Sequence, residues 1–197
     1  MTRNGWRWSR ARRWSAAAPD RESIARRQDQ GAATINRVIP EALGSLGRAD
    51  LQVAHLAGKG NVAETSKIYA AAGVKHLVLE SSDQMAAFYS AADMVFCRSG
   101  GGTVSELAFF GKYAVLVPFP FAAERHQDDN AAFYAASGAA AVVQDSACDQ
   151  ATIARLAAAA LADPERHVRL AAVLDRLAID VEFHRDPPAI NASQTSI

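Results

Sequence analysis

Residues 97–106 read CRSGGGTVSE and join a short apolar run to a helical pattern. The run before them, DMVFC at 93–97, is typical of a buried strand, and the helical pattern at 103–110 stops at Gly111. Glycines between a strand and a helix permit positive φ and let a ligand approach the backbone. The unpaired N–H groups and the dipole of the following helix favour a phosphate. The stretch therefore predicts an anion site.

Short apolar strands alternate with helices on both sides of this stretch. We expect strands at 51–56, 74–79, 93–97, 114–117 and 139–143. We expect helices at 32–46, 64–72, 85–92, 103–110, from the 124–129 loop to 137, at 149–161 and at 164–179. About five such β-α units imply a parallel sheet with helices on both faces. Right-handed crossovers then make a doubly wound, Rossmann-like α/β fold.

Polar or glycine-rich clusters follow four of the expected strands, at 58–61, 81–83, 99–103 and 124–130. Ligands of such sheets bind beyond the carboxyl ends of the strands, so the four clusters predict one site. The glycine turn lacks the Lys-Ser/Thr pair of a Walker A loop, and no acid about twenty residues later completes a dinucleotide fingerprint.

Glu106 lies instead inside the helix that follows the glycine turn. A carboxylate there suits a ribose diol, which offers two donors to one bidentate acceptor. Two alternatives remain from the residue type alone. The side chain can be a solvated surface glutamate, or it can reach back to Thr103 or Gly102 in a capping box.

Composition limits the class of protein. The 197 residues suffice for one domain with a sizeable core, and the net charge is zero. Cys97 and Cys148 provide neither a disulfide framework nor the spacing of a metal site, which fits a reducing, cytosolic compartment. No apolar run approaches the ~18–20 residues of a membrane span, and no secretory segment follows the basic start.

Residues 1–27 differ from the rest of the chain. They carry a net charge of +6 and all three tryptophans, Trp6, Trp8 and Trp14. We considered a basic arm for nucleic acid or anionic lipid, a disordered tail, and sequence foreign to the fold that comes from an alternative start or a shifted reading frame. The third reading is favoured, and binding of nucleic acid is not expected.

Residues 98–107, RSGGGTVSEL, resemble the motif of the glycosyltransferase family 28 C-terminal domain. Further matches in the same order are QGA at 30–32, IN at 35–36, GKG at 58–60, MAA at 85–87, PF at 118–119, HQ at 126–127 and NA at 130–131. The resemblance implies the C-terminal, donor-binding half of a GT-B glycosyltransferase, at residues 28–181, followed by a polar tail at 182–197. It also implies inverting, metal-independent transfer of N-acetylglucosamine from UDP to a lipid-linked acceptor in bacterial peptidoglycan synthesis, without a cofactor.

The resemblance implies a role for each residue of the site. Glu106 would hold the ribose, and the residues that meet the diphosphate and the near face of the sugar are Ser99, Gly100, Gly101, Gly102 and Thr103. The sugar hydroxyls would be bound by His126, Gln127 and Asn130. Ser82 falls at the uracil edge, where the family usually has an apolar residue, and Gln30 and Gly31 belong to the facing loop. No catalytic residue is assigned, because the base belongs to the family's N-terminal domain.

The sequence departs from the family before Gly31. The apolar strand is missing or unrecognisable, and Asp29 replaces a serine on the phosphate side, where a carboxylate would repel a diphosphate. We therefore expect a truncated donor-binding domain that is impaired alone. The alternatives are an active half-enzyme that reaches its lipid-linked acceptor through a separate acceptor-domain subunit, and a non-catalytic binding remnant. The expected location is the cytoplasm or the inner face of the plasma membrane.

Overall fold

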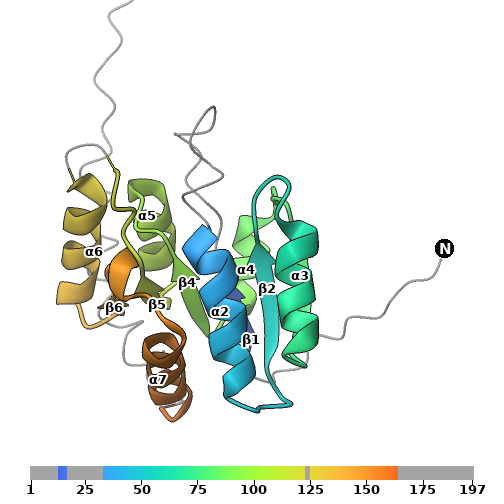
Figure 1. The fold of residues 1–197 in the computed structure, drawn as a ribbon. Helices are drawn as coiled ribbons and strands as arrows, with labels where there is room; N and C mark the ends of the chain where they lie inside the picture. Colours follow the sequence, from blue (N-terminus) through green and yellow to red (C-terminus); the bar gives the residue numbers. More distant parts are fainter. Residues whose placement is uncertain (1–12, 17–32, 123–124, 164–197) are drawn as a thin grey trace, which may run out of the picture.

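The computed structural model describes residues 13–16, 33–122 and 125–163 (Figure 1). Predictions for other residues lie outside this range. They concern the loop with Gln30 and Gly31, the helix at 164–179 and the tail at 182–197.

The described residues form one six-stranded sheet in which every pair of neighbours is parallel, in the order β3-β2-β1-β4-β5-β6. The strands are β1 Arg13–Ala16, β2 Gln52–Leu56, β3 Lys75–Leu79, β4 Met94–Cys97, β5 Tyr113–Leu116 and β6 Ala140–Val142. The helices are α2 Ala33–Ser45, α3 Val62–Ala71, α4 Met85–Ala91, α5 Gly101–Phe109, α6 His126–Ala136, the 3₁₀ helix η3 Asp145–Ala147 and α7 Gln150–Leu161. The chain moves outward from β1 twice, which is the doubly wound topology that the sequence predicts.

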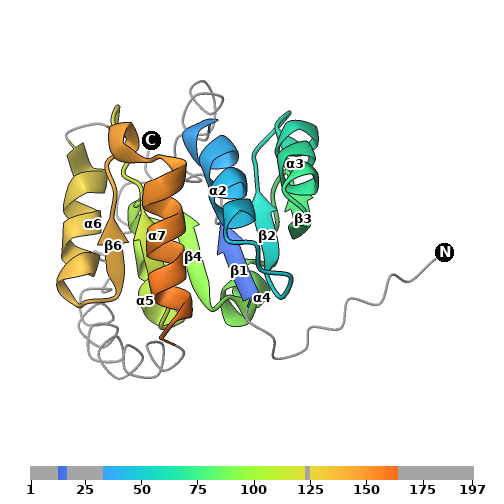
Figure 2. The same cartoon turned by 60° about the horizontal axis from the view of Figure 1, so that its bottom comes forward.

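Helices cover both faces of the sheet. Figures 1 and 2 show α2, α3 and α7 on one face and α4 and α5 on the other, with α6 beside α5 and β6. Strands β4 and β5 are buried at every position, whereas the edge strands β3 and β6 are partly exposed. Continuous apolar runs mark β4 and β5 because parallel strands in the middle of such a sheet meet helices on both sides.

The central strand β1 consists of residues 13–16, which the sequence places in the foreign leader. Its backbone pairs with β2 on one side and with β4 on the other, with Trp14 opposite both Val53 and Met94. The strand that the sequence leaves missing is therefore present in the sheet. A parallel strand is held by backbone hydrogen bonds to both neighbours, so four residues without an apolar run can fill this position.

A polar network lies inside the core between β2, α2 and α3. The ring of His55 is 1% exposed, with Nδ1 3.0 Å from the hydroxyl of Tyr69 and Nε2 2.8 Å from Oδ1 of Asn36. The Asn36 amide nitrogen donates to the carbonyl of Ala57 at 2.9 Å. Oδ1 of Asn36 therefore accepts from Nε2–H of His55, and the Tyr69 hydroxyl donates to Nδ1. The network holds His55 in its neutral form.

Stability is expected to fall when the pH drops below about 6.5, because burial lowers the pKa of His55 to about 4. Between these values the unfolded chain binds a proton at His55 and the native chain does not, so the free energy of unfolding falls as the pH falls. The loss between pH 7 and pH 5 is about 2 kcal/mol. Urea unfolding at both pH values checks this, and His55→Gln should reduce the difference by that amount. The exposed His126→Gln is the control, and an unchanged difference in His55→Gln would contradict the assignment.

Candidate functional site

The loops at the carboxyl ends of the strands meet at one edge of the sheet, as the sequence predicts. The strand order reverses between β1 and β4. Helices α2 and α5 begin on the two sides of this point (Figure 1). In open parallel sheets this is the place where ligands bind.

The glycine turn opens α5 two residues earlier than the sequence predicts. Gly100 is the N-cap, with φ −62° and ψ 150°, and the helix begins at Gly101. None of the three glycines has a positive φ, so that expectation is wrong. What their lack of side chains provides is space, because Gly101 and Gly102 are exposed and a Cβ at Gly102 would meet nothing within 4 Å. The first-turn N–H groups, which lack acceptors within any α-helix, are therefore open to a ligand.

Glu106 lies on the same side of α5 as this open space. It follows Gly102 by four residues, and such pairs share a face of a helix. The capping box is excluded, because the cap residue Gly100 has no side chain and the third helical position is Thr103. The carboxylate of Glu106 is exposed and pairs with no other described residue. This arrangement leaves both carboxylate oxygens available to a ligand beside the start of α5.

The turn is fixed to α6 by hydrogen bonds from Ser99. Its hydroxyl donates to the carbonyl of Gln127 at 2.7 Å, and the Asn130 side-chain amide donates to the carbonyl of Ser99 at 3.0 Å. The Gln127 side-chain oxygen accepts from the N–H of Phe119 at 2.9 Å. The structure thus brings Ser99, Gln127 and Asn130 together as the sequence predicts. It uses their side chains to join the wall of the site, and sugar binding by Gln127 and Asn130 stays a prediction.

His126 is the first residue of α6, and its side chain is exposed. The preceding Arg125 has a φ of 59°, which is uncommon for a residue other than glycine. Its guanidinium Nε lies 3.1 Å from Oδ2 of Asp128. The helix therefore begins directly after a residue in the left-handed conformation, and contact of His126 with a sugar stays a prediction.

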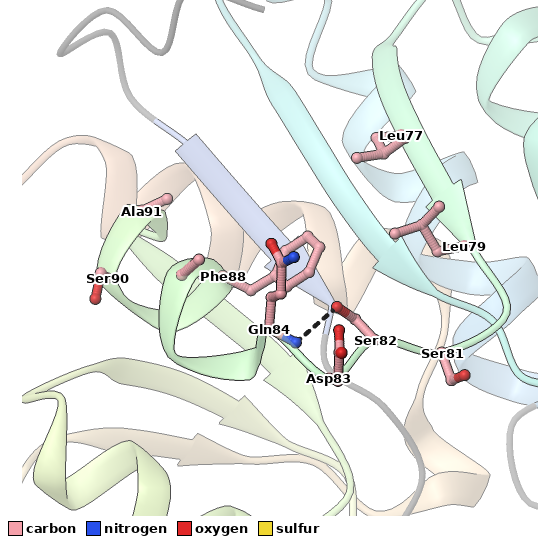
Figure 3. A pocket seen from close by; sticks show the side chains of 10 residues that line it. Leu77, Leu79, Ser81, Ser82, Asp83, Gln84, Phe88, Ser90 and Ala91 are labelled. Atoms are coloured by element: carbon pink, nitrogen blue, oxygen red, sulfur yellow. Dashed lines mark hydrogen bonds between the residues drawn. The ribbon is translucent and has the colours of Figure 1, made fainter.

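Ser82 lines a hollow of about 630 Å³ between β3 and α4. Figure 3 shows Leu77 and Leu79 projecting from β3 toward the side on which α4 presents Phe88. The mouth is polar, and the Ser82 hydroxyl accepts from the N–H of Gln84 at 3.0 Å. A hollow with apolar walls and a polar rim can take a flat ring with polar edges, such as a nucleobase.

The sequence gives no role to Arg98 as a side chain, and the structure shows one. The residue is 6% exposed, and its Nη1 donates to the carbonyls of Val117 and Pro118 at 3.0 and 3.1 Å. Its Nη2 lies 2.7 Å from Oδ1 of Asp145. Asp145 belongs to η3, far along the chain, so local sequence patterns carry no signal for this pair.

Within ranges 33–122 and 125–163, His, Cys, Asp and Glu side chains do not gather in threes that could hold a metal ion. None of the helices there has the length and apolar character needed to cross a membrane.

Comparison with known proteins identifies the family. The glycosyltransferase family 28 C-terminal domain matches residues 29–173. A Burkholderia cenocepacia protein, UDP-N-acetylglucosamine–N-acetylmuramyl-(pentapeptide) pyrophosphoryl-undecaprenol N-acetylglucosamine transferase, is 45% identical over 119 residues, which are 58% of this chain and 32% of that protein. The protein of the same name from Saccharophagus degradans is 40% identical over 143 residues, 72% of this chain and 37% of that protein. The chain thus spans about a third of the length of these relatives.

Solved structures show the same fold. The crystal structure of Acinetobacter baumannii MurG matches with a TM-score of 0.67 at 28% identity, over 88% of this chain and 50% of that one. Spinosyn rhamnosyltransferase SpnG, complexed with thymidine diphosphate, matches with a TM-score of 0.58 at 16% identity, over 89% of this chain and 45% of that one. The latter likeness concerns the fold alone.

Proposed function

Since the chain belongs to the glycosyltransferase family 28 C-terminal domain family, we propose that it binds UDP-N-acetylglucosamine and forms the donor half of an N-acetylglucosaminyltransferase. The observation that carries this proposal is the pairing of an open helix start at Gly101 and Gly102 with the exposed, unpartnered carboxylate of Glu106 on the same face. One side offers N–H groups to an anion, and the other offers two acceptors to a diol. A nucleoside diphosphate carries both ligand groups: its diphosphate can accept from the N–H groups, and its ribose diol can donate to the carboxylate.

The remaining parts of the donor follow the edge of the sheet in both directions. The uracil ring occupies the hollow at Ser82, where its polar edge meets the hydroxyl and the backbone at the start of α4. The diphosphate lies on the first turn of α5, with Ser99 to Thr103 around it. The sugar lies toward the start of α6, within reach of His126, Gln127 and Asn130.

The chemistry of this half is stabilisation of the leaving group. In inverting transfer an acceptor oxygen attacks the anomeric carbon from the face opposite UDP, and the bond from that carbon to the phosphate oxygen breaks. Negative charge grows on the departing diphosphate, where first-turn N–H groups and the helix dipole are preorganised to receive it. The acceptor and the base that takes its proton belong to the other half of such an enzyme. The relatives' names indicate an acceptor linked to the lipid undecaprenol. We infer that transfer takes place at the cytoplasmic face of the membrane.

UDP-N-acetylglucosamine is expected to raise the melting temperature of the chain. A ligand at a hundred times its Kd adds about 2.7 kcal/mol of stability, which corresponds to about 5–10 °C for a domain of this size. Differential scanning fluorimetry measures the shift at ligand concentrations up to about 10 mM, which suit a weak site. GDP-mannose serves as the control, because it offers the same ribose and diphosphate with another base and another sugar. Equal melting temperatures with and without UDP-N-acetylglucosamine would reject the proposed function.

A further inference from the structure

Arg98 is held by groups from two parts of the fold. Its Nη1 bonds the carbonyls of Val117 and Pro118, directly after β5, and its Nη2 pairs with Asp145 in η3, after β6. The guanidinium carbon also lies 5.5 Å from the centre of the Phe119 ring. A planar guanidinium that contacts several groups at once fixes their relative orientation as well as their distance. The side chain therefore sets how the segment 117–119 leaves β5.

Asp145 is itself fixed from the opposite side of the site. Its Oδ2 accepts from the hydroxyl of Thr34 at 3.2 Å, in the first turn of α2. Its side chain is 22% exposed and that of Arg98 is 7% exposed, so solvent screens the ion pair little. A buried charge that loses its partner is strongly unfavourable, which keeps the two groups together. Thr34, Asp145 and Arg98 thus form a continuous link from α2 to the end of β5, named here the Arg98 link.

The Arg98 link leads to one residue of the sugar region. Phe119, whose ring lies at the guanidinium, donates its N–H to the side-chain oxygen of Gln127 at 2.9 Å. The Gln127 carbonyl in turn accepts from Ser99, the neighbour of Arg98. The contacts close a ring, from Arg98 through the segment 117–119 to Gln127 and back to Ser99. A shift of that segment would therefore move the Gln127 amide, while the start of α5 keeps its own hydrogen bonds.

We propose that Arg98 is a positioning residue for the donor sugar, acting through the segment 117–119 on Gln127, with Asp145 and Thr34 holding Arg98 in place. The inference rests on the proposed function, since it assigns Gln127 to the sugar. Recognition of the donor then has two parts, which depend on different elements of the fold. The nucleoside diphosphate depends on α4 and α5, and the N-acetylglucosamine depends on the Arg98 link.

The test compares UDP with UDP-N-acetylglucosamine, which differ only in the sugar. Titration calorimetry on the full chain gives both Kd values for wild type, Arg98→Met, Arg98→Lys and Asp145→Asn, at a temperature where each variant is folded. Arg98→Met should weaken UDP-N-acetylglucosamine about tenfold relative to UDP, and leave the Kd for UDP within about threefold. Asp145→Asn and Arg98→Lys should give smaller changes of the same ratio, because each keeps part of the contact set.

The control is Arg48→Met, which removes an exposed ion pair with Asp50 (2.6 Å) in the loop after α2 and should leave the ratio unchanged. Equal weakening of both ligands, or an unchanged ratio in a folded Arg98 variant, would assign Arg98 a structural role only and overturn the inference. If Arg98→Met does not fold, Asp145→Asn and Arg98→Lys decide by the same ratio. Failure of the wild-type chain to bind either ligand would instead reject the proposed function, and the inference with it.

Discussion

Replacing Glu106 by alanine is expected to weaken binding of UDP about 100-fold. The loss corresponds to about 3 kcal/mol, the worth of two hydrogen bonds from a ribose diol to a charged carboxylate. The fold should be unaffected, because the side chain is exposed on α5 and forms no hydrogen bond or ion pair with another described residue, and alanine is a good helix former. Titration of UDP into the wild type and the variant measures the effect.

Two further variants show whether the effect belongs to the carboxylate at this place. Glu106→Gln keeps one oxygen acceptor and loses the charge, so its Kd should lie between those of the wild type and the alanine variant. Glu41→Ala removes a carboxylate from the middle of α2, where it pairs with the exposed Arg37 at 3.9 Å. It should bind UDP as the wild type does. If the Kd of Glu106→Ala for UDP stays within threefold of the wild-type value, Glu106 does not bind the ribose and is a solvated surface glutamate.

Replacing Phe96 by alanine is expected to lower the free energy of unfolding by about 3–5 kcal/mol. Phe96 is 0% exposed on β4, which lies between β1 and β5. The cost combines lost burial with the cavity that remains, since neighbours on both faces of a central strand cannot close in fully. Native domains are only about 5–15 kcal/mol stable, so this change removes a large share. Chemical unfolding followed by circular dichroism gives the value.

Phe133→Ala is the matched control for this change, because the ring lies on α6 and is 59% exposed. Its effect should stay within about 0.5 kcal/mol. Similar losses in the two variants would mean that β4 is not the centre of the core. The melting temperature of Phe96→Ala should also fall by about 10 °C, which gives a second measure on the same samples.

The sequence predicts most of the sheet because its signals are local. Apolar runs at 93–97 and 114–117 mark β4 and β5, the strands that are buried on both faces. The alternation of strands and helices then determines the topology, since crossovers in such folds have one hand. β1 escapes prediction for the opposite reason. Its four residues carry no apolar pattern, and their place in the sheet follows from pairing with β2 and β4.

The site is predicted in part for a similar reason. The glycine turn and Glu106 lie within one strand-turn-helix unit, so spacing along the chain places them. The start of α5 is misjudged by two residues, because glycine favours helix interiors little and is still tolerated in the first turn. The pairing of Arg98 with Asp145 joins residues from different units. Spacing carries no information on such a contact, and only the folded sheet brings its members together.

The position of β1 has a consequence for how the sheet keeps other chains away. β2 and β4 do not pair with each other; each turns its inner edge to the four residues of β1. Without that strand, both inner edges would present unpaired N–H and C=O groups, with apolar side chains beside them. Open edges of this kind recruit strands from neighbouring molecules and lead to aggregation. Residues 13–16 thus cover the inner edges of both half-sheets. We expect both the topology of the sheet and the resistance of the protein to aggregation to depend on them.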